Sequence, residues 1–406
     1  MRTRGGCGLD SRLYWIWLQA AVPLGHRAAG RILEDGRRPE AIHAAGENEL
    51  AAMGLAGLPG LLDKQLDGAA DTLRRACAGK DWVLTPDDAA YPQRLREIAG
   101  PPLALFCRGD ALDWQERPAF GLVGTRRATD GGKRNAACLA AGLAAGGMIV
   151  VSGGAVGIDG AAHFGAVRAG GVTVVVMACP VTGTYPEENE ELRREIVASG
   201  GLLLSEFPPG RAAKCDFHVR NRLISGLSVG VCLGETPERS GSLITGTLAR
   251  DQGRDVYAMP GDLQTGRNGG AHQQIRSGAV LVTRAEEILE DYQERFPGLL
   301  DLQAAAKAQE AMSAFCRRQM NGRARQAPEA GKRRAARERR DDEPRPLPAG
   351  ASAQAAALHA LLKAEPAQAD TLAETAGLPL SQALAALTEL ELLGAARGYP
   401  GRRYGL

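Results

Sequence analysis

Three short loops rich in glycine and serine have the residue types best suited to holding a phosphate group. They are Gly124-Thr125-Arg126, the run from Ser152 to Asp159, and the run from Glu238 to Ser242. Small residues let a backbone approach a ligand closely, and the first turn of a helix offers unpaired N–H groups with a partial positive charge. Several such loops together suit a polyanion as well as a mononucleotide. Any single loop can also be a tight turn that serves packing.

Two arginines add positive charge to this set. Arg220 and Arg222 flank Asn221 at the start of a predicted helix. The helix dipole disfavours cations at a helix N-terminus, so the pair calls for an anionic partner. Guanidinium groups bind phosphate through paired hydrogen bonds. Salt bridges to nearby acidic side chains are the structural alternative.

The common catalytic signatures do not occur in the sequence. There is no G-x-x-x-x-G-K-[ST], no HExxH and no G-x-S-x-G, and the segment Gly121 to Arg126 lacks the spacing of a dinucleotide fold. None of the eight cysteines belongs to a CxxC pair, so there is no zinc-ribbon pattern. We therefore expect a binding protein and not an enzyme, with no catalytic residue, no metal and no cofactor.

The elements that position these loops indicate an α/β domain over residues 81–292. Short apolar runs alternate there with amphipathic stretches of about 10–15 residues. The runs are Phe120–Val123, Met148–Val151, Val172–Met177, Leu202–Leu204, Val229–Leu233, Val256–Met259 and Val280–Val282. Valine-rich runs suit strands of a parallel sheet that is buried on both faces. The loops that follow such strands gather at one edge of the sheet, where ligands bind.

Length and composition bound the other possibilities. The 406 residues suffice for roughly two to four domains. With 49 Lys and Arg against 47 Asp and Glu, the net charge of +2 neither demands nor excludes nucleic acid. The 52 glycines show no G-X-Y period, which excludes collagen, and 4% aromatic residues argue against a broad base-stacking platform. We see no signal peptide or membrane span and expect a cytoplasmic protein.

Three regions flank the predicted core. Residues 9–80 predict a helical domain, in which the turn Gly57-Leu58-Pro59-Gly60 fits either a plain turn or a helix-hairpin-helix that presents N–H groups to DNA. Residues 293–350 are rich in arginine and predict a basic disordered linker. Residues 351–406 predict a winged helix-turn-helix. Its presumed recognition helix carries Glu389 and Glu391 but no Lys or Arg, which leaves protein contact and weak DNA binding both open.

Taken together, seven segments resemble the DNA-processing protein A family (DprA, also called Smf). Each segment is weak alone, but they occur in the family's order between about residues 91 and 290. They are Gly124-Thr125-Arg126, Ser152 to Asp159, Tyr185-Pro186-Glu187-Glu188-Asn189, Ser205-Glu206-Phe207-Pro208-Pro209-Gly210, Arg220 to Ser228, Glu238 to Thr245, and Ala258-Met259-Pro260-Gly261. The helical and winged-helix regions resemble the family's usual flanking domains, of which the first is SAM-like.

The resemblance implies an extended Rossmann-like domain that binds single-stranded DNA by its backbone and protects it. It also implies a homodimer that loads RecA recombinase during natural transformation. By motif, the residues that should face the DNA backbone are Gly124, Arg126, Ser152, Gly153, Gly157, Arg220, Asn221, Arg222, Ser240, Gly241 and Ser242. Phe217 is the nearest candidate for stacking on a base, with core packing as its alternative.

The sequence also departs from the family pattern. Gly154 replaces a usual leucine and Val156 a usual basic residue, so a cation normally near the phosphates is missing. Two other functions stay open. One is a nucleotide or nucleoside-phosphate hydrolase on a related Rossmann-like fold, although Gly153-Gly154 lacks the rest of that group's signature. The other is a transcription regulator led by the winged helix.

Overall fold

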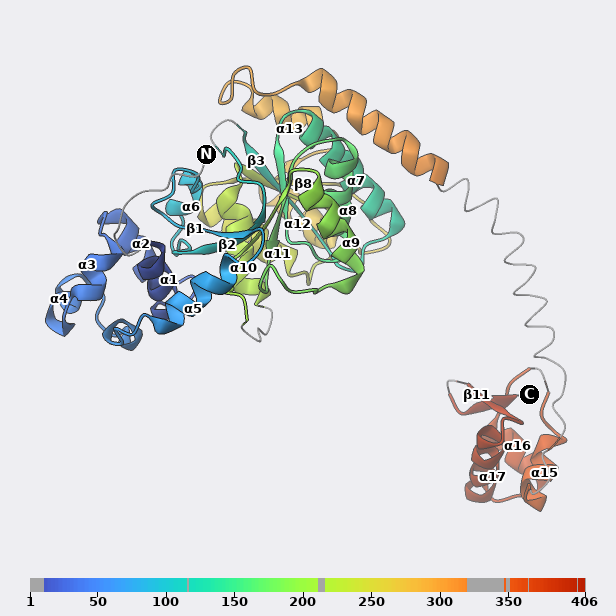
Figure 1. The fold of residues 1–406 in the computed structure, drawn as a ribbon. Helices are drawn as coiled ribbons and strands as arrows, with labels where there is room; N and C mark the ends of the chain where they lie inside the picture. Colours follow the sequence, from blue (N-terminus) through green and yellow to red (C-terminus); the bar gives the residue numbers. More distant parts are fainter. Residues whose placement is uncertain are drawn as a thin grey trace. The chain divides into compact units, whose positions relative to one another are not determined.

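The computed structural model describes residues 11–114, 117–210, 216–319, 347, 351–363, 365–399 and 401–405. By contacts between residues the chain divides into two compact units, Met1–Arg317 and Arg318–Leu406 (Figure 1). Each unit is described by itself. None of the described helices combines the length and the apolar character that a membrane span requires.

A mostly parallel sheet forms the centre of the first unit. Its nine strands within the described residues are β1 (Asp81–Leu84), β2 (Leu105–Gly109), β3 (Ala119–Val123), β4 (Ile149–Ser152), β5 (Thr173–Met177), β6 (Leu202–Ser205), β7 (Gly230–Leu233), β8 (Asp255–Ala258) and β9 (Val280–Leu281). The strands from β6 through β9 are parallel, whereas β1 and β2 pair antiparallel at one edge. The predicted α/β class is confirmed, and β1 and β2 are strands that the sequence analysis missed.

The strand order predicts where a ligand crevice lies on the sheet. The order is β1-β2-β6-β5-β4-β3-β7-β8-β9. After β3 the chain moves outward through β4, β5 and β6 and then returns to the other side of β3 for β7, β8 and β9. In open α/β sheets, ligands bind outside the carboxyl ends of the strands where the order reverses. In this sheet that point lies beyond the ends of β3 and β7.

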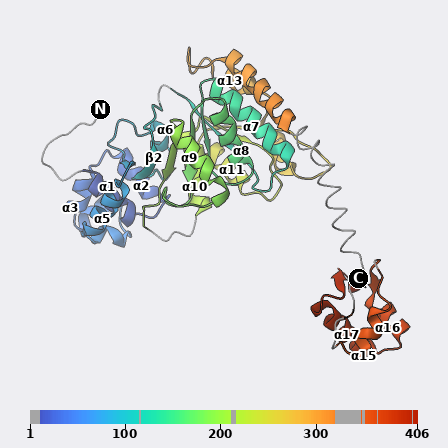
Figure 2. The ribbon, with the colours of Figure 1, turned by 45° about the vertical axis from the view of Figure 1, so that its right-hand side comes forward.

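Helices cover both faces of the sheet. One face carries α7 (Asp130–Ala145), α8 (Ile158–Arg168), α9 (Glu190–Ala198) and α13 (Ala285–Tyr292), and a short 3-10 turn (Glu187–Asn189) precedes α9. The other face carries α6 (Gln93–Arg96), α10 (Phe217–Leu227), α11 (Ser242–Asp251) and α12 (Gly269–Arg276). Figures 1 and 2 both show α7, α8 and α9 side by side. Along β5, Val174 and Val176 enter one core while Val175 and Met177 enter the other, as the period of two requires.

The linker predicted over residues 293–350 begins before the folded part of the first unit ends. Residues 302–319 are helical, and the buried Met312 packs against Ala137 and Ala141 of α7. Ala305, also buried, joins the core beneath α7 and α13. The arginine-rich composition beyond Arg317 outweighed the helical spacing of these apolar residues in the prediction. The part of the predicted linker from 320 to 346 lies outside the described residues.

Helices fill most of the N-terminal region. They are α1 (Ser11–Ala21), α2 (Arg27–Glu34), α3 (Pro39–Ala44), α4 (Glu47–Ala52), a 3-10 turn (Pro59–Leu62) and α5 (Asp67–Ala76). Their apolar core also contains Val83, Leu103 and Phe106 from the neighbouring edge of the sheet. The side chain of Gln19 in α1 accepts hydrogen bonds from the N–H groups of Leu103 and Ala104, at 2.8 and 3.0 Å. A separate SAM-like or helix-hairpin-helix domain at 9–80 therefore stays a proposal.

The second unit has the order of a winged helix, as predicted. Its elements are α15 (Ala353–His359), β10 (Ala367–Gln368), α16 (Ala369–Ala376), α17 (Leu380–Leu392), β11 (Arg397–Tyr399) and β12 (Arg403–Gly405). The described strands form a small sheet in the order β10-β12-β11. Leu358, Leu372, Leu387 and Leu390 lie in its buried core. Gly377 ends α16 in the left-handed conformation that glycine adopts freely.

His163 of α8 is a buried histidine held neutral by its surroundings. Its Nδ1 lies 2.8 Å from the hydroxyl of Thr173, which itself donates to the carbonyl of Val150. The Thr173 oxygen therefore accepts from Nδ1–H, and Nε2 carries no proton. Burial, reinforced by the charge of Arg220, lowers the pKa of His163 to about 3.

This burial makes stability depend on pH. Below the ordinary value of 6.5 the unfolded chain binds a proton that folded His163 refuses until about pH 3, so acid should destabilise the fold. The loss attributable to this residue should reach about 2 kcal/mol between pH 6.5 and pH 5. Urea unfolding of the protein and of His163→Gln at both pH values measures it, because the variant lacks the titrating group. Equal pH dependence in the two proteins would contradict the assignment, as would an NMR titration of the His163 ring near pH 6.5.

Candidate nucleic-acid interface

A groove of about 420 Å³ lies at the carboxyl edge of the sheet, where the strand order reverses. Its walls come from the loops after β3 and β4, the first turn of α10 and the loop into α11. Eight of the predicted site residues line it: Gly124, Arg126, Phe217, Arg220, Asn221, Ser240, Gly241 and Ser242. The structure therefore brings together most of the residues that the sequence analysis selected from separate motifs.

Two glycines allow the loops of the groove to touch. A Cβ on Gly124 would lie 2.5 Å from a side-chain carbon of Ile158, and a Cβ on Gly157 would lie 2.3 Å from the carbonyl oxygen of Thr125. Gly157 also has a φ of 89°, which side-chain-bearing residues rarely adopt. The Thr125 N–H donates to the Glu235 carbonyl at 2.8 Å, and the Ile158 N–H donates to the Thr125 carbonyl at 3.2 Å. Gly157 thus shapes the Gly124–Arg126 loop without lining the groove.

Arg220 stiffens the base of the groove. Its guanidinium donates to the carbonyl of Gly153 at 2.6 Å and to that of Val176, and the residue is only 4% exposed. A Cβ on Gly153 would lie 2.6 Å from the guanidinium, so glycine makes room for it. Asp159, in the first turn of α8, is buried beside this cation. Burial raises the pKa of Asp159, and the charge of Arg220 and the N–H of Ala155 oppose that rise.

Exposed guanidinium groups supply most of the positive charge. Arg126, Arg127 and Arg239 line the groove and are exposed. Among the described residues, Arg220 brings the arginines that line the groove to four, against one carboxylate, that of Asp159. The sequence analysis missed Arg127 and Arg239, although each adjoins a selected residue. Their exposure and common orientation toward one groove are not readable from the sequence.

Phe217 is the aromatic residue of the groove. The Arg126 guanidinium lies 4.1 Å from its ring centroid, and the ring of Tyr185 lies 6.0 Å away. Phe217 is half-buried, so it is neither a core residue nor a free platform. A base that stacks on the face covered by Arg126 must displace that guanidinium.

The loop into α11 offers hydroxyl and N–H groups. The hydroxyls of Ser240 and Ser242 lie 2.7 Å apart, and that of Ser242 lies 3.2 Å from the hydroxyl of Thr236. Gly241 precedes the helix, and a Cβ there would meet nothing within 4 Å. Packing therefore does not require glycine at this position. An exposed residue without a side chain leaves the N-terminus of α11 open to an anion.

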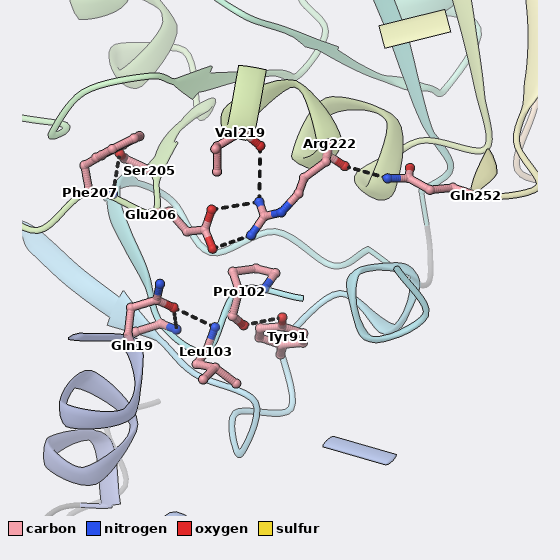
Figure 3. Close-up of polar contacts among 11 residues, drawn as sticks. Gln19, Tyr91, Pro102, Leu103, Ser205, Glu206, Phe207, Val219, Arg222 and Gln252 are labelled. Carbon is pink, nitrogen blue, oxygen red and sulfur yellow. Dashed lines mark hydrogen bonds and ion pairs between the residues drawn. The ribbon is translucent and has the colours of Figure 1, made fainter. Parts of the chain in front are cut away.

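Four predicted site residues do not line this groove: Ser152, Gly153, Gly157 and Arg222. The structure gives Ser152 and Arg222 other partners. Ser152 is fully buried at the end of β4, where its hydroxyl donates to the carbonyl of Leu122 at 2.6 Å. Arg222 forms a two-point ion pair with Glu206, at 2.7 and 2.6 Å, as Figure 3 shows. The salt-bridge alternative therefore holds for Arg222, because α10 turns it away from Arg220. Gly153 and Gly157 act on the groove indirectly, as described above.

No group of three or more His, Cys, Asp or Glu side chains in the described part of the chain could hold a metal ion.

Comparison with known families decides the relationship. Residues 82–293, more than half of the chain, match the family described as DNA recombination-mediator protein A, and residues 342–402 match the DprA winged helix domain. The chain belongs to the DprA (Smf) family. The resemblance drawn from the sequence motifs is thus confirmed.

Relatives from several bacteria share this region. The DNA processing protein DprA of Bacillus subtilis is 41% identical over 206 residues, which is 50% of this chain and 69% of the relative. That of Streptococcus pneumoniae is 39% identical over 207 residues, or 51% of this chain and 72% of the relative. The match to two Mycobacterium tuberculosis DprA proteins, at 40% identity over 56% of this chain, spans 61% of their length.

A solved structure agrees with the fold. The X-ray structure of DprA from Streptococcus pneumoniae superposes with a TM-score of 0.59 and 31% identity, and it covers 70% of this chain and 98% of that protein. The Rossmann-like description of the core therefore rests on both sequence and structure.

The buried ion pair predicts that Arg222 serves stability. Glu206→Gln removes the carboxylate and leaves the Arg222 charge without a counter-charge, which should cost about 3–5 kcal/mol of unfolding free energy. The double variant Glu206→Gln/Arg222→Met removes both charges and should cost less than Glu206→Gln alone. Urea unfolding measures both. A fully stable Arg222→Met protein that binds oligonucleotide poorly would contradict this assignment.

Proposed function

We propose that this DprA-family chain binds single-stranded DNA by its sugar–phosphate backbone, as a binding protein and not an enzyme. The observation that carries the proposal is the groove at the switch point of the sheet, whose described lining has four arginines against one carboxylate. The open N-terminus of α11 and the hydroxyl of Ser240 add donors of the kind that phosphate oxygens accept. None of these donors reads a base, so we expect binding without sequence preference.

The shape of the site favours a single strand. The groove is concave, and its walls are loops and the first turns of α10 and α11. Phe217 offers one ring at its wall, and an unpaired base can turn to stack on such a ring whereas a paired base cannot.

Fluorescence anisotropy with an unstructured oligonucleotide tests this function. Arg126→Ala and Arg239→Ala each remove an exposed cation from the groove, so each should weaken binding several-fold for any sequence. Each lost phosphate contact should also flatten the salt dependence of the logarithm of affinity by about 0.7. Arg276→Ala, an exposed arginine on α12 away from the groove, is the matched control. Binding that ignores salt, or that the control weakens equally, would defeat the proposal.

We further propose that the bound strand is protected and passed to RecA recombinase during natural transformation. Family membership supports this step, since the matched family is described as a recombination mediator. The same titration repeated with recombinase present separates simple binding from handover, because handover requires the recombinase to replace this protein on the strand.

A homodimer through the β9 edge is the assembly that we propose. Val280 and Leu281 of this strand are 51% and 50% exposed, and β9 ends the sheet within the described residues. A sheet edge with exposed apolar side chains is a template for pairing with a second copy.

Light scattering tests the dimer. Leu281→Lys places a charge in the proposed interface and should shift the protein to monomer without unfolding it, because the side chain is already half exposed. Leu263→Lys, at an 83% exposed loop position, is the control and should leave the mass unchanged. A wild-type monomer at micromolar concentration, or a Leu281→Lys dimer, would overturn the interface.

A further inference from the structure

A second and larger pocket, of about 710 Å³, lies at the opposite edge of the sheet from the groove. Ala119 opens β3, Arg254 directly precedes β8 and Leu227 ends α10, and all three line the pocket. Ala119 is the amino end of β3, whose carboxyl end, Val123, borders the groove. The two sites share no lining residue. The pocket therefore needs an explanation of its own.

Three arginines from separate parts of the chain converge on this pocket. Arg94 lies in α6, Arg254 precedes β8, and Arg295 follows α13. Burial, together with the charges of Arg295 and Arg254, lowers the pKa of Arg94. Like charges gathered in a partly enclosed space repel each other, and a bound anion removes that cost.

Arg254 carries an unused donor at this place. The residue is 9% exposed, and its Nη2 donates to the carbonyl of Arg94 and to Glu97, each at 3.1 Å. Its Nε is buried and has no hydrogen-bond partner among the described residues. A buried donor left unpaired carries a free-energy cost.

The carboxylates around the pocket decide what kind of recognition is possible. Glu97 and Asp113 also line it, so two of the three positive charges are offset. Glu97 is engaged by Arg254 at 3.1 Å. Net charge alone therefore does not select an anion here. Selection must come from directed guanidinium donors, which match phosphate oxygens in geometry as well as in charge.

Flat rings complete the lining. Trp114 and Phe296 border the pocket, both only partly buried against the core, and Tyr91 forms part of the floor with its hydroxyl donated to the carbonyl of Pro102 at 2.7 Å. Pockets of a few hundred to about 1,000 Å³ with apolar walls and a few directed polar groups are typical of small-ligand sites. Rings beside guanidinium groups suit a flat base beside a phosphate.

We propose that this pocket is a second nucleotide-binding site, which holds a phosphate between Arg94 and Arg295 and the attached base against Trp114 or Phe296. The phosphate offers three acceptor oxygens to the converging guanidinium groups, one more than a carboxylate does. The ligand is either a free mononucleotide or one nucleotide of a single strand that continues around the molecule. The pocket shares no lining residue with the groove. Binding of a free mononucleotide does not rest on the proposed function, whereas binding of a strand does.

Calorimetric titration of the full chain with dAMP, with inorganic phosphate and with a thymidine oligonucleotide tests the site. The variant Arg94→Gln/Arg295→Gln removes the two cations that are not deeply buried, so the fold should persist, and circular dichroism checks it. Affinity for dAMP should fall about tenfold or more in this variant, as expected for the loss of charged hydrogen bonds. Arg276→Gln, at an exposed position of α12, should bind dAMP as the unaltered protein does.

The three ligands distinguish the sources of the phosphate. Saturable dAMP binding that exceeds phosphate binding by about fivefold or more indicates a free nucleotide whose base stacks on a ring. No dAMP binding, but weaker and less salt-dependent oligonucleotide binding in Arg94→Gln/Arg295→Gln, indicates a strand that reaches the pocket. The proposal is overturned if the double variant changes neither ligand, if Arg126→Ala alone abolishes both, or if an acidic peptide binds where dAMP does not.

Discussion

Close contact between the loop after β3 and the loop after β4 is the constraint on which the candidate site depends. Without side chains at Gly124 and Gly157, the Thr125 carbonyl can accept the first N–H of α8, and the Thr125 N–H can reach the loop after β7. The strands β3, β4 and β7, which are separated in the sequence, therefore end in loops that contact one another and form one rim. The exposed Arg126 projects from this rim, so its position follows from backbone packing that contains no charge at all.

Charge on this molecule is divided between cations that hold the fold and cations that remain available. Arg220 and Arg222 lie two residues apart on α10, yet one reaches backbone carbonyls at the base of the groove and the other meets Glu206. Arg126 and Arg239 sit on loops and keep their charge near water. The near-zero net charge of the whole chain hides this division, because many of the compensating acids lie away from the groove.

The sequence predicts the structure best where a local pattern decides the outcome. Runs such as Val172–Met177 predict buried strands because a short, continuous apolar segment fits a strand that is buried on both faces. The order of the motifs along the chain identified the family. The sequence predicts less where distant residues decide. Nothing near Arg222 in the chain marks Glu206 as its partner, and Ser152 reads as a loop donor although it ends a buried strand. The antiparallel β1 and β2 were missed; Val83 and Phe106 of these strands are buried against the N-terminal helices.

The N-terminal helices and the edge of the sheet are joined by a shared apolar interior. Val83, Leu103 and Phe106 face helices α1 to α5 and not solvent, and the amide of Gln19 satisfies two main-chain donors between the strands. A shortened chain that began at β1 would uncover this interior and leave those donors to water. Such a fragment would expose an apolar surface at one edge of the sheet. Precipitation of an isolated core would then reflect the absence of the N-terminal helices and not an unstable sheet.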